Sequence, residues 1–161
     1  IVGKRGEATD FAKMHLGSNL ERLIRSTNRP VLVAARAFKE IKRILVAFDG
    51  GRSSYGAIEY ISSNTLYSNL ECHIVVAGKN GSRGQTQSVH AKNLLKKAGI
   101  KYEVFFERGE PEKVISGHVE QHSIDLLVMG AYGHSRIRNL MVGSTTTQMI
   151  RSCLVPVLLF R

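Results

Sequence analysis

Ile124-Asp125-Leu126-Leu127-Val128-Met129 runs directly into Gly130-Ala131-Tyr132-Gly133, and much of the architecture can be worked out from this junction. A short, continuously apolar run is typical of a strand buried on both faces of a parallel sheet. The glycines that follow lack Cβ atoms, so the backbone can adopt positive φ and approach a ligand closely. After nine further residues, Gly143-Ser144-Thr145 opens a helix, whose free N–H groups and positive dipole end favour phosphate.

Strands and helices alternate along most of the chain. Apolar runs predict strands at 42–48, 71–77, 101–106, 124–129 and 155–160. Amphipathic segments with capping residues predict helices near 53–64, 85–98, 109–122 and 143–153. Because short links join these elements, we expect right-handed crossovers. The predicted fold class is therefore α/β: a doubly wound, open, Rossmann-like parallel sheet of five strands in the order 3-2-1-4-5.

The C-terminal pattern also occurs near the N-terminus. Gly17-Ser18, Ile24-Arg25-Ser26 and Pro30-Val31-Leu32 recur 126 residues later as Gly143-Ser144, Ile150-Arg151-Ser152 and Pro156-Val157-Leu158. Internal repetition of this kind marks repeated structural units. We therefore expect residues 1–37 to be the C-terminal remnant of a preceding repeat, built as strand, helix and strand. Residues 38–161 are expected to form one complete domain.

Composition narrows the choice of partners and compartment. The chain holds 23 Lys and Arg against 13 Asp and Glu, and this net charge of +10 suits an anionic partner, unless the rest of a longer protein compensates it. A nucleic-acid partner is not expected, because no basic stripe is interleaved with aromatic residues. No apolar run approaches the roughly 20 residues that span a bilayer. Cys72 and Cys153 stand alone, which fits buried thiols in a reducing cytoplasm.

The predicted strand order places a ligand crevice between two particular strands. Ligands bind such sheets beyond the carboxyl ends of the strands, where the order reverses, here between strands 42–48 and 124–129. Asp49 directly follows the first of these strands and Gly130 directly follows the second. Asp49 can accept a hydrogen bond from a ribose hydroxyl or a base amino group, and Arg136 and Arg138 can supply charge to phosphates. The alternative is that the glycines only form a turn and that Ser144 only caps a helix.

Two histidines have the spacing of metal ligands. His118 and His122 are one turn apart on the helix predicted at 109–122, and such a pair can bind Zn²⁺. No third ligand lies near them in sequence, and zinc sites need three or four protein ligands. We therefore expect no metal there, and instead a protonated histidine near the negative end of the helix dipole.

The glycine spacing resembles that of a known protein family. The chain has neither a GxxxxGK P-loop nor, at Asp49-Gly50-Gly51, a dinucleotide GxGxxG. Its Gly-x2-Gly-x9-Gly-Ser pattern at Gly130, Gly133, Gly143 and Ser144 instead resembles the ATP-binding branch of the universal stress proteins. Matches at 46–50, 109–111 and 155–159 extend the resemblance over 38–161, and residues 1–37 resemble the last third of a family domain, as in a tandem two-domain member.

This resemblance implies an adenine-nucleotide hydrolase-like fold that binds ATP, with or without Mg²⁺. Adenine and ribose would be held by Ala47, Phe48, Asp49, Ala77 with its neighbour Val76, Met129 and Gly130. The phosphates would be surrounded by Gly133, His134, Arg136, Gly143, Ser144 and Thr145. Residues 1–37 lack the strand that bears the aspartate, so no nucleotide site is expected in them alone.

The resemblance also implies a stress-response regulator rather than a fast enzyme. No general base is evident, so ATP hydrolysis should be slow at most. Family members dimerise through their last strands, which predicts that Val155–Phe160 pairs antiparallel with Pro30–Ala35, in a homodimer or an intramolecular pseudo-dimer. The alternative function is a dimerisation or interaction module that works without nucleotide.

Overall fold

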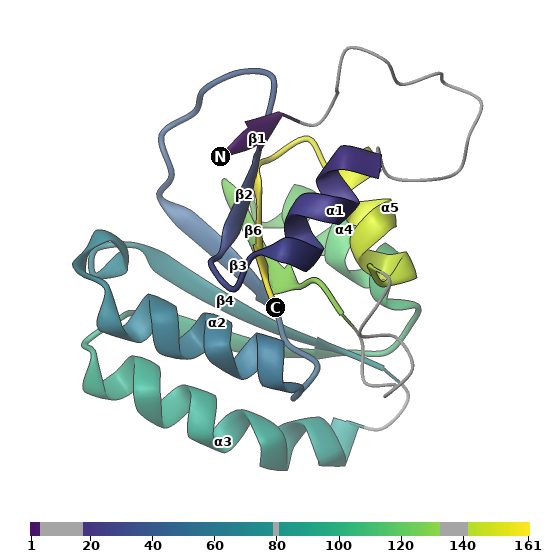
Figure 1. Ribbon diagram of the computed structural model, residues 1–161. Coiled ribbons are helices and arrows are strands. Elements are labelled where there is room, and N and C mark those ends of the chain that lie inside the picture. Colours follow the sequence, from purple (N-terminus) through teal and green to yellow (C-terminus); the bar gives the residue numbers. More distant parts are fainter. Residues whose placement is uncertain (4–17, 79–80, 133–141) are drawn as a thin grey trace.

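The computed structural model describes residues 1–3, 18–78, 81–132 and 142–161 (Figure 1). The strands are β1 (Val2–Gly3), β2 (Val31–Ala34), β3 (Arg43–Ala47), β4 (Glu71–Ala77), β5 (Tyr102–Glu107), β6 (Leu126–Gly130) and β7 (Val157–Phe160). The helices are α1 (Ser18–Ser26), α2 (Arg52–Ser63), α3 (Gly81–Lys97), α4 (Pro111–Gln121) and α5 (Ser144–Ser152), with a short 3-10 turn η1 (Thr65–Tyr67).

Within the described residues, one sheet of seven strands has the order β1-β2-β7-β6-β3-β4-β5. The prediction of a five-stranded sheet is therefore corrected, because β1 and β2 extend it beyond β7. β2 runs antiparallel to β7, whereas the other neighbouring pairs are parallel. An uncovered β7 would expose a row of unpaired backbone groups, and β2 pairs with them instead.

The N-terminal segment pairs with β7, as its sequence predicted. Val31 of β2 pairs with Leu159 of β7 and Val33 with Val157, which confirms the antiparallel pairing within one chain. Val33 is fully buried, and Ile24 of α1 belongs to the same apolar cluster as Val157 and Leu159 of β7. The segment therefore contributes to the hydrophobic core as well as to the edge of the sheet.

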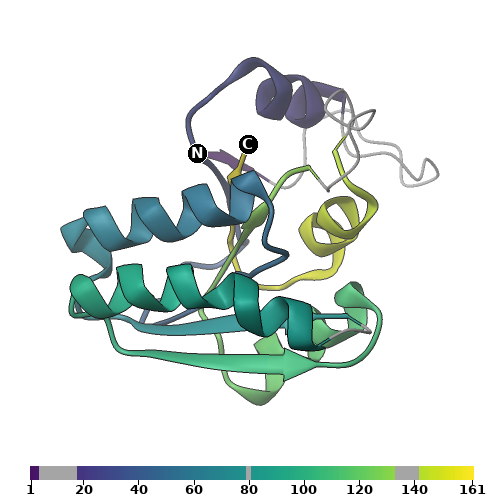
Figure 2. The same cartoon turned by 90° about the horizontal axis from the view of Figure 1, so that it is seen from below.

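The alternation of side chains along each strand divides the core into two layers. Leu45, Val75 and Leu127 face α1, α4 and α5 in one cluster. Ile44, Ile74, Val128 and their neighbours face α2 and α3 in the other cluster. Figures 1 and 2 show α2 and α3 side by side on their face of the sheet, and Figure 1 shows α1, α4 and α5 gathered on the opposite side. Both faces are thus covered, as the apolar strands require.

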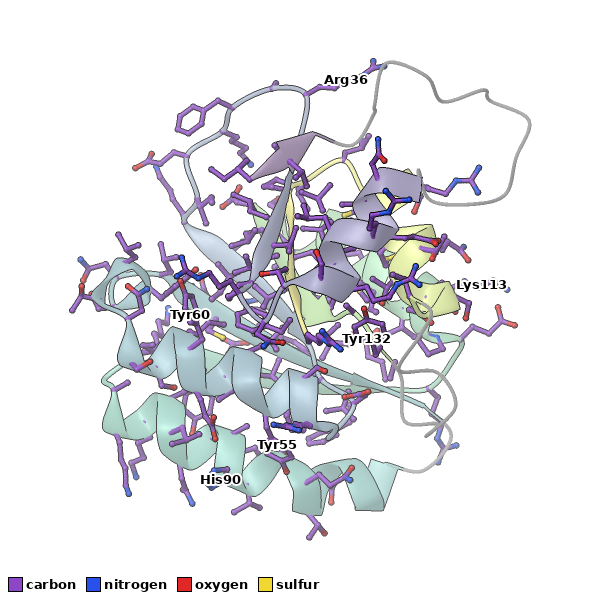
Figure 3. All side chains as sticks on the ribbon, in the orientation of Figure 1. Arg36, Tyr55, Tyr60, His90, Lys113 and Tyr132 are labelled. Carbon is purple, nitrogen blue, oxygen red and sulfur yellow. The ribbon has the colours of Figure 1, made fainter. Side chains whose placement is uncertain are left out.

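Tyrosine and cysteine side chains are used for packing. Tyr55, labelled with His90 in Figure 3, links α2 to α3, because its hydroxyl donates to the carbonyl of Gln87 at 2.6 Å. Both cysteines are buried, as predicted. Burial raises the pKa of the Cys72 thiol to about 12, so this thiol is unreactive in the folded protein.

Among the described residues, each helix is too short or too polar to cross a membrane.

Asp125 joins β6 to β3 at the end of the sheet opposite the predicted crevice. Its Oδ2 accepts the backbone N–H groups of Lys42 at 3.0 Å and Arg43 at 2.9 Å. Its Oδ1 lies 2.6 Å from the Lys39 ammonium. Burial alone would raise the pKa of this carboxyl, but these three partners outweigh burial and hold the pKa below its usual range. The charged form is therefore the stable one in the folded protein.

Candidate functional site

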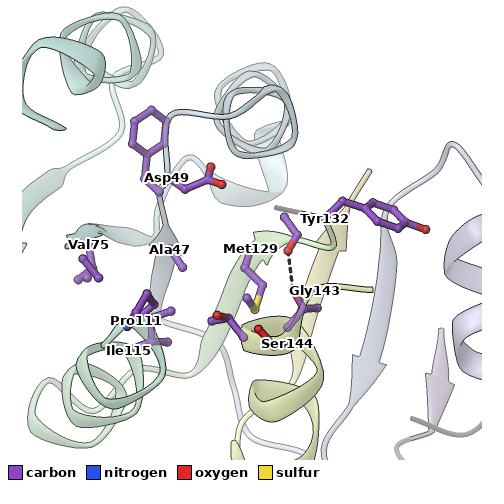
Figure 4. A pocket seen from close by; sticks show the side chains of 14 residues that line it. Ala47, Asp49, Val75, Pro111, Ile115, Met129, Tyr132, Gly143 and Ser144 are labelled. Carbon is purple, nitrogen blue, oxygen red and sulfur yellow. Dashed lines mark hydrogen bonds between the residues drawn. The ribbon is translucent and has the colours of Figure 1, made fainter. Parts of the chain in front are cut away.

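A cavity of about 200 Å³ lies between the carboxyl ends of β3 and β6 (Figure 4). This is where the direction of the chain connections reverses, so the topology leaves room for a ligand there. The lining residues are Ala47, Phe48, Asp49, Val75, Ala77, Pro111, Ile115, Met129, Gly130, Tyr132, Gly143, Ser144, Thr145 and Thr146. They come from β3, β4, β6, α4 and the start of α5, which are separate in sequence.

Most of the predicted site residues meet in this cavity. Its lining includes Ala47, Phe48, Asp49, Ala77, Met129, Gly130, Gly143, Ser144 and Thr145. Val76 does not line it, because its side chain packs with the cluster on the α2 and α3 side of the sheet. The predicted residues Gly133, His134, Arg136 and Arg138 lie outside the described residues.

The β3 side of the cavity is organised around Asp49. Its Oδ1 accepts hydrogen bonds from the backbone N–H of Gly51 at 2.9 Å and the hydroxyl of Ser54 at 2.8 Å. Gly50 has φ +72°, a conformation that favours glycine and turns the chain sharply into α2. The first turn of α2 therefore fixes the direction of an exposed carboxylate, which stands on the β3 side in Figure 4.

The β6 side brings the backbone close to the helices. A Cβ on Gly130 would lie 3.0 Å from the Cβ of Ser53, so this position suits glycine. Thr146 donates to the carbonyl of Gly130 at 2.9 Å, and the N–H of Gly143 donates to the carbonyl of Ala131 at 3.0 Å. These two bonds hold the N-terminus of α5 against the end of β6.

The start of α5 lines the cavity and has no side-chain cap. Its N-cap is Gly143, which makes no side-chain cap, and Ser144 already lies inside the helix. The alternative that Ser144 serves only as a cap is therefore not what the structure shows. The Thr145 hydroxyl donates to the Glu112 carboxylate at 2.7 Å, so an acidic group stands beside this helix end. Helix N-termini without a side-chain cap favour anions or water.

Sequence reasoning missed the apolar wall opposite Asp49. Val75, Pro111 and Ile115 line the cavity together with Met129. Val75 could have been expected, since it is two residues before Ala77 and shares its face of β4. Pro111 and Ile115 are four apart on α4 and so lie on one helix face. Tyr132 also borders the cavity, but its ring points away from it in Figure 4.

A second group of polar side chains lies beneath α4. The rings of His118 and His122 stack with centroids 4.1 Å apart, and His73 of β4 joins them. Burial, more than any other cause, lowers the pKa of both His73 and His118. The expectation of a protonated histidine at the helix end is therefore corrected for His118, which is buried and favours its neutral form.

The covered, mostly parallel sheet, with a cavity at its carboxyl edge, defines an α/β protein with a Rossmann-like fold. The family model of the universal stress protein family matches residues 77–161, which is more than half of the sequence. The chain belongs to the universal stress protein family.

Individual relatives extend this assignment. The chain is 44% identical to universal stress protein Slr1230 of Synechocystis sp., over all of this chain and 57% of that protein. A universal stress protein from Archaeoglobus fulgidus matches with a TM-score of 0.72 at 28% identity, covering 99% of this chain and 59% of that one. A universal stress protein in complex with cAMP matches in fold with a TM-score of 0.64 at 24% identity, covering 76% and 98%. The chain thus spans less than two thirds of the first two relatives.

Proposed function

We propose that this chain is an adenine-nucleotide-binding regulator of stress responses, with ATP in the crevice between β3 and β6. The observation that carries the proposal is the convergence of Asp49, the apolar wall and the uncapped start of α5 on one cavity. A family member in complex with cAMP supports an adenine nucleotide as the ligand.

The cavity offers a separate environment for each part of the nucleotide. Ala47, Val75 and Ile115 are small or branched apolar residues, and they suit the faces of a purine ring. Asp49 is positioned to accept a hydrogen bond from the ribose or the base. The N–H groups at the start of α5, with Ser144, are the binding groups for the phosphates.

Mg²⁺ fits the phosphate end of this arrangement. Glu112 places a carboxylate beside Thr145, and this negative charge would repel a phosphate. Carboxylate and hydroxyl oxygens are the hard ligands that Mg²⁺ prefers, and the ion would offset that repulsion.

The cavity offers little for catalysis of hydrolysis. Among the residues that the structure describes, Asp49 is the only carboxylate that lines the cavity, and its Oδ1 already accepts a hydrogen bond. We therefore propose that the chain hydrolyses ATP slowly at most.

We further propose that residues 1–37 are the last part of a preceding repeat in a cytoplasmic tandem protein. The match to just over half of the relatives' length supports this proposal. In that protein the pairing of β2 with β7 would form a pseudo-dimer interface between repeats. The burial of Val31 and Val33 against β7 also supports the second candidate function, an interaction module that works without nucleotide.

Calorimetry on the whole chain tests the first proposal through Ser144→Asp. An acidic residue in the first turn is favourable for α5 itself, so the variant should fold, whereas its charge should repel phosphate. We expect ATP affinity to fall about tenfold or more, since one like charge nearby costs about 1–2 kcal/mol, while adenosine affinity changes little.

The matched control is Ser18→Asp, at the equivalent position of the N-terminal copy and the start of α1. It should leave ATP binding unchanged. The proposal is wrong if the unaltered chain fails to bind ATP at millimolar concentration with Mg²⁺. It is also wrong in its placement of the phosphates if Ser144→Asp binds ATP as tightly as the unaltered chain.

A further inference from the structure

Three histidines meet between α4 and the sheet, away from the nucleotide crevice. His73 lies on β4, and His118 and His122 lie one turn apart on α4. One ring nitrogen from each lies within 4.8 Å of the others. His73 is 3% exposed and His118 1%, whereas His122 is half-buried. We propose that this histidine triad is a binding site for a divalent transition-metal ion, with Zn²⁺ as the best match to its ligands.

The spacing of the nitrogens is close to what Zn²⁺ requires. His73 Nδ1 lies 2.9 Å from His118 Nε2. Two nitrogens bound to one tetrahedral Zn²⁺ at about 2.0–2.1 Å each would stand roughly 3.3 Å apart. A separation larger by a few tenths of an ångström therefore admits the ion, and small ring rotations provide it. Three imidazoles with one open position are a ligand set that zinc uses elsewhere.

The outer nitrogens of two rings already face carboxylates. His118 Nδ1 lies 3.0 Å from Glu107 Oε1. His73 Nε2 lies 3.7 Å from Glu71 Oε1, an oxygen that also lies 3.8 Å from the Lys101 ammonium. Metal-bound histidines almost always give their second N–H to a carboxylate, a carbonyl or water, which fixes the tautomer and the ring orientation. The triad has this outer layer in place for both of its buried members.

If the rings are neutral, one ring nitrogen points a lone pair at a carboxylate, and a bound metal would remove this mismatch. If His118 donates from Nδ1 to Glu107, its Nε2 is an acceptor, so His73 must donate from Nδ1. His73 Nε2 then carries no hydrogen and points a lone pair at the Glu71 carboxylate. With a metal bound, His73 Nδ1 and His118 Nε2 both act as ligands, and each outer N–H faces a carboxylate. The competing solution is a second proton on His73, which satisfies the same contacts.

The half-buried His122 gives the site an entrance and completes the ligand set. Arg43 donates from its guanidinium to the carbonyl of His122, and so holds the C-terminal end of α4 against β3. The Arg43 guanidinium also pairs with Glu71 at 2.9 Å, so its charge is compensated by a carboxylate that faces the triad. A bound ion would fasten α4 to β4, two elements that the contact between His73 and His118 already joins.

Calorimetric titration of the whole chain, without a histidine tag and without nucleotide, tests the site with Zn²⁺. We expect one ion per chain, and Co²⁺ in its place should give the intense visible absorption of a tetrahedral complex. His122→Gln removes a half-buried ligand and should reduce Zn²⁺ affinity about a hundredfold or more. Glu107→Gln acts only through His118 and should reduce it about tenfold to a hundredfold. Thermal unfolding of each variant without metal checks that it is folded.

His90→Gln is the matched control, because His90 lies on α3 beside Tyr55 and outside the triad. It should bind Zn²⁺ as the unaltered chain does. The proposal is overturned if the unaltered chain shows no saturable binding of one Zn²⁺ per chain, which would leave a shared proton as the solution. It is equally overturned if His122→Gln binds Zn²⁺ with unchanged affinity.

Discussion

The two hydrogen bonds between Asp125 and the chain at the start of β3 give a prediction about stability. Asp125→Ala removes a carboxylate that accepts the N–H groups of Lys42 and Arg43. Each hydrogen bond to a charged group contributes about 1.5–3 kcal/mol. Water can reach both N–H groups once the carboxylate is gone, so we take the lower value for each. The free energy of unfolding should then fall by about 3 kcal/mol, which lowers the melting temperature by about 6–12 °C for a chain of this size.

Two matched variants separate the parts of this effect. Asp125→Asn keeps a carbonyl oxygen that can accept the same bonds, but it loses the charge. Because charge-assisted bonds are about twice as strong as neutral ones, the loss should be about 1.5 kcal/mol. Lys39→Ala removes an ammonium that is 69% exposed despite its 2.6 Å contact with Asp125. Exposed ion pairs contribute little, so this variant should lose less than about 1 kcal/mol.

The contribution of Asp125 should also depend on pH in a defined direction. Its pKa is lowered in the folded protein, where burial is outweighed by Lys39 and the two backbone N–H groups. A carboxyl with a lowered folded pKa adds stability above its unfolded pKa of about 3.9, and this stability is lost as the pH falls through the folded value. The difference between the unaltered chain and Asp125→Asn should therefore be full at neutral pH and shrink below about pH 4.

Urea unfolding at a series of pH values measures these differences directly. Comparing each variant with the unaltered chain at the same pH removes the effect of other acidic groups, such as Glu71, whose pKa the Arg43 guanidinium lowers. A difference for Asp125→Asn that stays constant from neutral pH to about pH 3 would refute the electrostatic reasoning. A loss for Lys39→Ala as large as that for Asp125→Ala would show that the ion pair, and not the backbone bonds, carries the stability.

Further predictions concern single positions in the fold. Gly56→Ala should raise the free energy of unfolding by about 0.5–1 kcal/mol, because Gly56 lies inside α2 with open space at its Cβ. Gly50→Ala should lower the free energy of unfolding by about 1–2 kcal/mol, because Gly50 has a positive φ. Urea unfolding of the two variants measures both changes. Val33→Thr buries a hydroxyl and should lower the free energy of unfolding by about 1–3 kcal/mol. The same change at the half-exposed Val89 should lower it by less than about 0.5 kcal/mol. Equal losses at the two positions would contradict the assignment of β2 to the core. Cys72, with its raised pKa, should react with a thiol reagent only after unfolding, and fast labelling of the native chain would contradict its burial.

The sequence predicted the individual strands more accurately than the number of strands in the sheet. β3 and β6 were expected from apolar runs, and each begins and ends within about two residues of its expected bounds. β1 and β2 were assigned to a remnant outside the five-stranded sheet, although the pairing of β2 with β7 was predicted. The repeat showed that the N-terminal segment resembles the C-terminal one, but it could not show that both would share one sheet and one core. That outcome depends on the burial of Val33 and Ile24.

The position of the candidate crevice could be predicted from the sequence, whereas part of its apolar wall could not. Asp49 and Gly130 follow from the rule that parallel sheets bind ligands at their carboxyl edge, and the glycine pattern added the start of α5. Pro111 and Ile115 were not foreseen, because they belong to a helix whose approach to the cavity depends on how α4 packs. Packing depends on the complementary shapes of several elements, and no short stretch of sequence contains that information.

The histidine triad was missed, although the sequence and the predicted topology together contain the reason for it. α4 connects β5 to β6, and β4 and β3 lie between those two strands, so a right-handed crossover must carry α4 across β4. The period of two along β4 places His73 on the same face as Val75, towards α4. His118 follows Ile115 by three residues and therefore faces the sheet with it. A search for ligands near His118 in sequence could not find His73, whereas a search over the strands beneath α4 would have found it.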